Sequence, residues 1–250
     1  WFGKRKQTEG QCPISGQPKD QEAQKLQWTL VKYSTPHIIT EGAVQYPLGS
    51  LKGREIHYDF EKILIYLNAK GKLLFGKKFK IYREDRKILY KLCLYFIQDK
   101  ARCTQLGIDI QKGVLLSGPV GCGKTSLMKL LKHIVPHQRP YEVIPCRNIV
   151  FGFNHIGYKI IEDYGNSQFF CFDDLGVEPT GRHFGQDCNV IGEILLSRHE
   201  LFINDRRKTH ATTNLNAQEL EDRYGNRVRS RMRELFNLIA FDKSVGDKRK

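Results

Sequence analysis

Apolar and polar positions repeat with two different periods over the second half of the chain, and the change of period predicts its elements. Residues 113–117 form a short apolar run that predicts a buried strand, and residues 126–134 continue with apolar positions at helical spacing. Strands that alternate with helices predict an α/β fold with a central parallel sheet and helices on both faces. Further strands are predicted at residues 141–146, 169–172, 209–213 and 238–241, and further helices at residues 149–164 and 189–202, from near residue 216 and around residues 227–235.

The first part of the chain is less regular. Residues 1 to about 50 are rich in Gln, Lys, Gly and Pro and show only weak periodicity near residues 26–31, so we expect an irregular arm. Apolar positions over residues 60–67 predict a short helix that ends near Gly71. The wide apolar face of residues 88–97 predicts a second helix that leads into the first strand of the sheet.

The composition is that of an ordinary globular protein, with 40% hydrophobic and 27% charged residues. No apolar run is long enough to span a membrane and no hydrophobic signal core opens the chain, which predicts a cytoplasmic protein without a membrane partner. The seven cysteines lack C-x-x-C spacing, as expected for reduced thiols. His133 and His137 flank Pro136, which would break the helix needed to align them as metal ligands. The sequence begins at Trp1 rather than Met, so we expect a fragment or a trimmed chain.

The formal net charge of +14 makes nucleic acid or another polyanion the leading class of partner. Residues 70–91 carry nine Lys and Arg against Glu84 and Asp85, and the end of the chain from Arg223 is similarly basic. Either cluster alone is compatible with a solvated surface. Two clusters on one chain favour DNA or RNA.

A glycine-rich loop joins the strand at residues 113–117 to the following helix. It reads G-x-x-x-x-G-K-T, the pattern of a phosphate-binding loop. The glycines let the backbone turn tightly so that successive N–H groups point at a β-phosphate, Lys124 reaches the β- and γ-phosphate oxygens, and the Thr125 hydroxyl ligates Mg²⁺. The sequence therefore predicts that ATP and Mg²⁺ bind at Gly118, Pro119, Val120, Gly121, Cys122, Gly123, Lys124, Thr125 and Ser126.

Two carboxylates follow the predicted strand at residues 169–172, at the end of the strand where open α/β sheets bind ligands. As in a Walker B motif, Asp173 would hold Mg²⁺ through water, and Asp174 would polarise the water that attacks the γ-phosphate. The alternative is an Asp-rich turn. Asn214, just past the strand at residues 209–213, is a candidate sensor that bonds the attacking water or the γ-phosphate, although an Asn after a strand is more often a helix cap.

The order of these motifs resembles that of a known family. The phosphate loop, the Asp-Asp pair, the Thr-Thr-Asn of residues 212–214 and the basic run of residues 223–232 are similar to those of the AAA+ ATPases of the bacterial helicase-loader and insertion-sequence group (DnaC/IstB-like), over roughly residues 80–245. The resemblance implies a homo-oligomer in which Arg231 is an arginine finger that enters a neighbouring subunit's active site. Arg227 is the second choice. For both arginines the alternative is a basic helix face that is solvated or lies on DNA phosphates.

Two features depart from the usual AAA+ pattern. Most AAA+ proteins have Asp-Glu where this chain has Asp173 and Asp174, which bears on the rate of hydrolysis. Only nine residues follow Phe241, too few for the helical lid that usually supplies a second sensor arginine, and loader-type members also lack that lid. We therefore expect a P-loop NTPase three-layer sandwich with an AAA+ core at residues 79–245 without the C-terminal lid, an irregular and helical extension at residues 1–78, and a basic tail at residues 246–250.

These features favour an ATPase that assembles side by side on DNA and alternates between assembled and released states, as helicase loaders do with a helicase partner. A regulatory ATPase of transposition, with a transposase as partner, is the second hypothesis. A small-molecule kinase shares the phosphate loop, but the paired acids and Asn214 indicate water as the phosphate acceptor. A nucleotide-gated scaffold with little turnover stays open, because loader-type ATPases are often slow.

Overall fold

The computed structural model describes residues 35–242 and 245–248 of the chain. Nearly all of the described residues belong to one compact unit, Pro36–Lys250, which is called the second unit of the chain below. Most of the predicted irregular arm, with the periodicity near residues 26–31 and with Cys12, lies outside the described residues.

A five-stranded parallel sheet forms the centre of the second unit, in the order β11-β5-β10-β7-β6. Every residue of β7 and β10 is buried, as expected for strands that are covered on both faces. The predicted strands are confirmed, with ends that differ by two residues or fewer. Their bounds are β5 Gly113–Ser117, β6 Glu142–Pro145, β7 Phe170–Asp173, β10 His210–Thr213 and β11 Phe236–Ala240.

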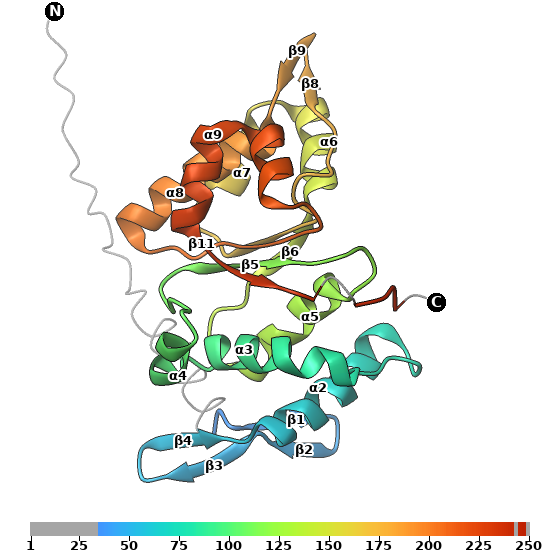
Figure 1. Ribbon diagram of the computed structural model, residues 1–250, viewed down its shortest axis with the longest axis vertical. Coiled ribbons are helices and arrows are strands. Elements are labelled where there is room, and N and C mark those ends of the chain that lie inside the picture. Colours follow the sequence, from blue (N-terminus) through green and yellow to red (C-terminus); the bar gives the residue numbers. More distant parts are fainter. Residues whose placement is uncertain (1–34, 243–244, 249–250) are drawn as a thin grey trace, which may run out of the picture. The chain divides into compact units, whose positions relative to one another are not determined.

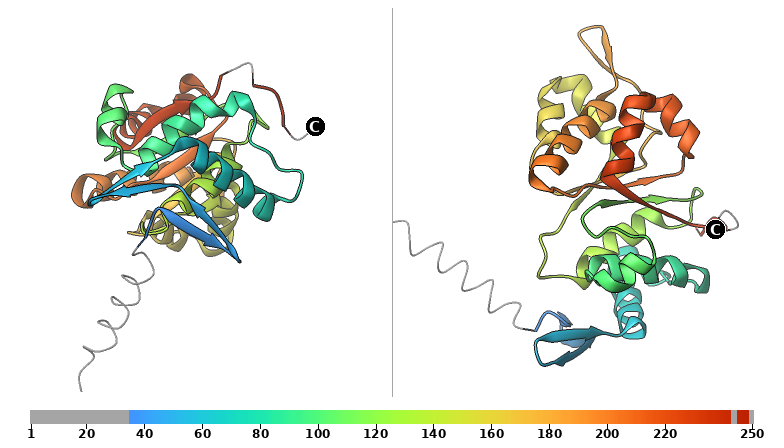
Figure 2. Two further views of the ribbon diagram at one scale, coloured as in Figure 1. Left: turned by 90° about the horizontal axis from the view of Figure 1, so that it is seen from below. Right: turned by 60° about the vertical axis from the view of Figure 1, so that its left-hand side comes forward.

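Helices cover both faces of this sheet and complete a three-layer α/β fold (Figure 1; Figure 2). A hydrophobic core lies on each side, one around Leu92, Leu116 and Met128 and the other around Phe172 and Ile194. The predicted P-loop NTPase sandwich is therefore confirmed. One helical layer consists of α6 Cys146–Ile156, α7 Lys159–Gly165, α8 Val190–Asp205 and α9 Ala217–Leu235. The other contains α3 Arg86–Phe96, α4 Lys100–Gln105 and α5 Lys124–Leu131, with α2 Phe60–Phe75 packed on α5. Two short 3₁₀ turns, η1 Arg83–Asp85 and η2 Lys132–Ile134, belong to this second layer.

The region before α2 is more ordered than its composition predicts. Two antiparallel hairpins precede the helix, and each turns at a glycine with a left-handed backbone, Gly42 (φ 60°) and Gly53 (φ 62°). The expectation of an irregular arm is therefore wrong for these residues, whose strands are too short to show a clear alternation. The strands are β1 Ile38–Glu41, β2 Val44–Pro47, β3 Gly49–Lys52 and β4 Glu55–Tyr58.

Glycines also explain where predicted helix ends differ. Helix α2 continues past Gly71, which is buried. A Cβ at this position would lie 2.1 Å from the Phe79 ring, so the glycine permits close packing and does not end the helix. The helix predicted at residues 149–164 is two helices, separated at Gly157 (φ 80°). The two helices predicted after residue 216 are joined as α9, with a kink at Gly225.

A third hairpin lies between β7 and α8. Its strands are β8 Gly181–His183 and β9 Gln186–Cys188. All cysteines of the described part of the chain are unpaired thiols. In the same part, no helix combines the length and the apolar character needed to cross a membrane.

Arg198 joins the segments that lead into two central strands. Its side chain on α8 is fully buried, and burial lowers the pKa of its guanidinium group to about 10, so the group is charged at neutral pH. The segments before β7 and before β10 both accept hydrogen bonds from this one cation, which fixes where the two strands begin. The acceptors are the carbonyls of Asn166, Gln168 (2.8 Å) and Lys208 (3.3 Å) and the hydroxyl of Thr209 (2.8 Å).

The variant Arg198→Met should be strongly destabilised, because it removes the cationic donor of four hydrogen bonds, and a hydrogen bond to a charged group contributes about 1.5 to 3 kcal/mol. We expect a loss of at least about 3 kcal/mol and a fall in Tm of at least about 6 °C, measured by thermal unfolding. Glu200→Ala, at an exposed position of the same helix, is the control and should change stability by less than about 0.5 kcal/mol. Equal Tm values for the two variants would contradict this role of Arg198.

Candidate nucleotide-binding site

The phosphate-binding loop connects the end of β5 to the start of α5. Gly121 and Gly123 have φ values of 79° and 98°, in the left-handed region that favours glycine. A Cβ on Gly118 would lie 2.7 Å from the Cβ of Phe241, so no side chain fits there. The Gly118 amide donates to the Thr213 carbonyl (3.2 Å) and ties the loop to the end of β10. Positive φ values at Gly121 and Gly123 and the lack of space at Gly118 thus explain why glycine occupies these three positions.

Lys124 is held inside the curve of this loop. The residue is buried, and its ammonium group donates to the carbonyls of Gly118 (2.8 Å) and Pro119 (2.9 Å). It is also the first residue of α5, where the helix dipole and the free backbone amides favour an anion. A fixed cation beside a helix N-terminus is the arrangement that binding of the β- and γ-phosphates requires.

Asp173, the last residue of β7, is buried and accepts hydrogen bonds from two hydroxyl groups. The donors are Thr125 of α5 (2.9 Å) and Thr212 of β10 (2.6 Å). The predicted metal ligands Thr125 and Asp173 are therefore adjacent, and they offer the hard oxygen donors that Mg²⁺ prefers. The residues present fit this ion.

Asp174 follows with φ 56°, in the left-handed region, which an aspartate adopts more readily than most residues. Its amide donates to the Thr212 hydroxyl (3.0 Å), so this one hydroxyl orients both members of the acid pair. Thr212 was not predicted as a site residue. Its signal in the sequence is that the strand at residues 209–213 is mostly polar, although a strand covered on both faces is expected to be apolar.

Asn214 lies directly after β10, on the same cavity as Lys124 and Asp174. Its amide oxygen is buried and has no hydrogen-bond partner in the part of the chain that the structure describes. A buried acceptor without a donor costs free energy, so this oxygen suits a donor supplied by a ligand. Asn216, and not Asn214, is the N-cap of α9.

The cavity at this edge of the sheet has a volume of about 440 Å³ and is lined by the loop, Asp174 and Asn214 together with a segment that the sequence did not predict. Residues 78–82, between α2 and η1, form another wall, where the ammonium group of Lys80 lies 4.8 Å above the ring of Tyr82. Lys78 and Lys80 belong to the basic cluster of residues 70–91, for which the sequence favours a nucleic-acid partner. Their position adds positive charge to the nucleotide cavity.

The basic cluster of residues 70–91 does not form one surface. Lys70 is an ion-pair partner of Glu41 (2.7 Å) and its side chain is only 15% exposed. Arg86 is paired with Glu61, which raises the pKa of its guanidinium group. Together with the two lysines of the cavity, these pairs remove four of the nine cations from a common phosphate-binding face.

The C-terminal residues 245–248 lie against the phosphate loop. The Lys248 amide donates to the Gly121 carbonyl (3.1 Å), and its ammonium group donates to the Cys122 carbonyl (2.9 Å) and pairs with the buried Asp85. A Cβ on Gly121 would meet the carboxylate of Asp247 at 2.0 Å, which shows how closely the segment approaches. Part of the predicted basic tail thus borders the candidate site.

The two predicted finger residues lie elsewhere. Arg231, in the last part of α9, is paired with Glu234 (3.3 Å), and its side chain is 43% exposed. Arg227 is exposed on the same helix. Among the described residues that line the nucleotide cavity, neither arginine is present.

The three-layer α/β sandwich and this phosphate-binding loop define a P-loop NTPase fold. No protein-family model matches the chain, and no curated protein matches it. Solved structures with a similar fold include the DnaC helicase loader (18% identity, 66% of this chain and 94% of that chain covered, TM-score 0.48) and DnaI (17% identity, 67% and 90% covered, TM-score 0.48). AMPPCP-bound DnaA from Aquifex aeolicus is also similar (17% identity, TM-score 0.47), with 71% of this chain and 51% of that chain covered. At these identities and TM-scores the comparisons carry no argument about function, which is inferred from this chain's own residues.

The variant Thr212→Val should weaken Mg²⁺-dependent nucleotide binding, because Asp173 loses one of its two hydroxyl donors and the Asp174 amide loses its acceptor. Thr213→Val is the matched control, since the Thr213 hydroxyl is also buried but donates to the Leu175 carbonyl (2.7 Å). Both variants should lose about 1 to 3 kcal/mol of stability. Only Thr212→Val should need more Mg²⁺ for half-maximal binding of a labelled ATP analogue, and the same Mg²⁺ requirement in both variants would contradict this role.

Proposed function

We propose that this chain binds ATP with Mg²⁺ at the phosphate-binding loop and hydrolyses it. The observation that carries the proposal is that α5 and the ends of β7 and β10 bring four polar side chains to one cavity. They are a buried cation, a hydroxyl, a carboxylate and an amide whose oxygen has no partner in the described part of the chain: Lys124, Thr125, Asp174 and Asn214.

In this proposal each side chain has one task. Lys124 binds the β- and γ-phosphate oxygens, while Thr125 and Asp173 hold Mg²⁺, which would neutralise charge on the phosphates. Asp174 accepts a hydrogen bond from the attacking water and orients it towards the γ-phosphate. Asn214 bonds the same water or the γ-phosphate and so reports whether the phosphate is present.

We further propose that the chain is an AAA+ protein that works as a homo-oligomer. Arg231 does not line the cavity of its own chain, so a role in hydrolysis requires that it reach the cavity of a neighbouring copy. Its exposed position on α9 suits such a contact. In trans, the guanidinium group would stabilise the charge that develops on the transferred phosphoryl group.

The proposed setting is DNA, with the chain acting as a nucleotide-controlled loader or regulator of a partner such as a helicase. The net charge of +14 supports a polyanionic partner. A regulatory ATPase of transposition, partnered by a transposase, is the alternative within the same class. A nucleotide-gated scaffold with little turnover differs only in rate, and a small-molecule kinase would use an acceptor other than water.

Two variants separate binding from hydrolysis. Lys124→Ala should abolish binding of a labelled ATP analogue, because backbone amides alone do not replace the ammonium group on the phosphates. Asp174→Asn should bind the analogue as the wild type does and hydrolyse ATP about 10² to 10⁴-fold more slowly. Comparable turnover in Asp174→Asn and the wild type would remove Asp174 from the mechanism, and negligible turnover in the wild type would favour the scaffold.

A mixing experiment tests the arginine in trans. Arg231→Ala should bind ATP normally and hydrolyse it about 10³ to 10⁵-fold more slowly, the effect of well-characterised arginine fingers. Mixing Arg231→Ala with Lys124→Ala should restore part of the activity, because some boundaries then join a working loop to a working arginine. Arg233→Ala, at an exposed position of the same helix, is the control, and a loss of activity in Arg227→Ala instead of Arg231→Ala would make Arg227 the finger. Mixed assemblies that form but stay inactive would exclude Arg231 as a finger.

A further inference from the structure

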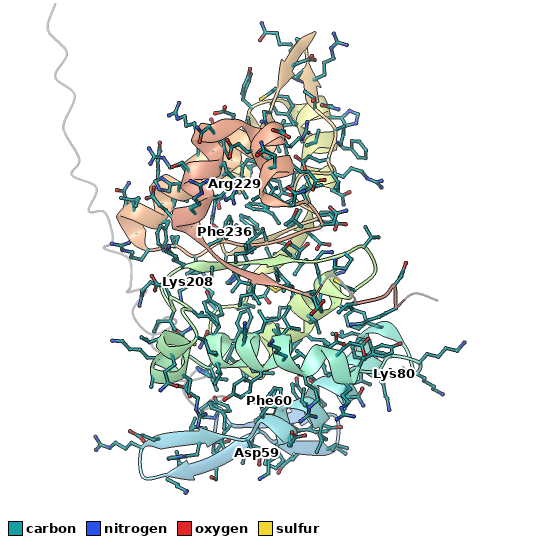
Figure 3. All side chains as sticks on the ribbon, viewed as in Figure 1. Asp59, Phe60, Lys80, Lys208, Arg229 and Phe236 are labelled. Carbon is teal, nitrogen blue, oxygen red and sulfur yellow. The ribbon has the colours of Figure 1, made fainter. Side chains whose placement is uncertain are left out.

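A second hollow lies at the opposite, amino edge of the sheet. It has a volume of about 190 Å³ and includes Tyr141, which comes just before β6, Phe169 just before β7, and His210, the first residue of β10. Figure 3 labels Lys208, from this hollow, on the other side of the view from Lys80, which lines the nucleotide cavity. The hollow is therefore separate from the nucleotide site.

Cations gather around this hollow from three parts of the chain. We call them the amino-edge cluster. Four of them line the hollow, and the fifth, Arg207, places its guanidinium group 5.4 Å from the centre of the Phe169 ring, beside which Arg139 also lies at 5.6 Å. The members of the amino-edge cluster are Lys132, Arg139, Arg206, Arg207 and Lys208.

The amino-edge cluster has little internal compensation. Within residues 35–242 and 245–248, none of its five members forms an ion pair, and the buried Arg198 adds a further cation beside Arg207. Burial lowers the pKa of Lys208 even though Asp109 acts in the opposite direction. Like charges that converge on a partly buried hollow repel one another unless an anion joins them.

The backbone around the hollow is also unusual. The structure describes four non-glycine residues with positive φ, and two of them, Gln98 (φ 61°) and Arg206 (φ 54°), line this hollow. A left-handed backbone is unfavourable for such side chains, and strain of this kind concentrates at ligand-binding sites. Arg206 follows the last residue of α8 as its C-cap, where a left-handed conformation is common, and it lies at the rim of the hollow.

The chemistry of the walls indicates what part of a ligand the hollow takes. The rings of Tyr95, Phe96 and Tyr141 are no more than 5% exposed, so they form its floor and offer no free face to a nucleobase. Phe169 already has two guanidinium groups beside its ring. The charged groups left for a ligand are all cationic, and their number exceeds what one small anion needs.

We propose that the amino-edge cluster binds successive phosphates of a nucleic-acid backbone, without reading its bases. This names a surface for the DNA of the proposed function, but it does not depend on ATP hydrolysis. Binding at this surface should vary little with base sequence and should fall steeply with salt, because each neutralised phosphate releases counterions.

The test measures binding of a labelled single-stranded DNA of mixed sequence to the full chain at several salt concentrations, between about 50 and 200 mM. Arg206→Gln/Arg207→Gln should reduce the slope of log affinity against log salt by about 1.4, at about 0.7 for each phosphate contact. Arg147→Gln/Arg182→Gln is the control, because it removes two exposed arginines that do not line the hollow, one beside Phe151 and one in β8, where it pairs with Asp187. Its slope should stay near that of the wild type.

Equal slopes in the cluster variant and the wild type, or an equal reduction in both double variants, would overturn the proposal. Arg206→Lys/Arg207→Lys keeps the charge and should retain the wild-type slope, which separates loss of charge from loss of folding. Lys124→Ala should bind the DNA as the wild type does, so a failure of the ATPase proposal leaves this result readable. Inorganic phosphate and ADP, added at constant ionic strength, should not displace the DNA from Lys124→Ala; displacement by either at millimolar concentration would show a small-anion site instead.

Discussion

The nucleotide site depends on the register of β10 between β5 and β7. Thr213 pairs with Ser117 of β5, and Ala211 pairs with Phe172 of β7, so the three strands end together. Thr212 then lies where its hydroxyl reaches the acid pair. A shift of β10 by one residue would turn this hydroxyl to the other face of the sheet and leave the buried Asp173 with one donor fewer.

The same strand also carries the other edge of the sheet. His210 begins β10, and its Nδ1 accepts a hydrogen bond from the Val114 amide of β5 (3.1 Å). Burial lowers the pKa of His210 to about 3, so the ring is neutral and keeps this acceptor at any physiological pH. Together with Arg198, which bonds the residues just before it, the histidine fixes the start of β10. The four residues of β10 therefore connect the nucleotide cavity at one edge to the cationic hollow at the other.

The sequence predicts those parts of the site that are formed by residues adjacent in the sequence. The phosphate loop lies between one strand and one helix, and the acid pair ends one strand, so local pattern was enough to find both. The wall at residues 78–82 and the contact of Lys248 with the loop were not predictable in this way, since they join segments far apart in sequence. The amino-edge cluster was still less predictable from the sequence, because its members come from three separate segments and no sequence motif joins them.

A buried carboxylate connects the acid pair to the helix that carries the candidate finger. Glu178, in the loop after β7, is buried; its carboxylate accepts hydrogen bonds from the Gly176 amide (2.8 Å) and the Tyr224 hydroxyl (2.7 Å) and lies 3.6 Å from the guanidinium group of Arg223. Tyr224 and Arg223 come just before the kink of α9 at Gly225. Burial, together with the nearby carboxylate of Glu178, raises the pKa of Tyr224 well above its usual value, so its hydroxyl stays a donor.

This network limits how the two parts can move. A displacement of the loop after Asp174 must either move the first half of α9 as well or break hydrogen bonds to a buried charge. In other proteins, removing one partner of a buried ion pair costs several kcal/mol. The second half of α9, beyond the kink, bears Arg231 and is bound instead through Met232, Leu235 and the Glu234 contact with His199 (3.0 Å). Both halves of α9 reach the same hydrophobic core, through Leu220 and Tyr224 before the kink and through Met232 and Leu235 after it, but only the first half is also bonded to the loop after the acid pair. Gly225 is therefore the point at which a displacement of that loop would either be passed on to the second half of α9 or be absorbed.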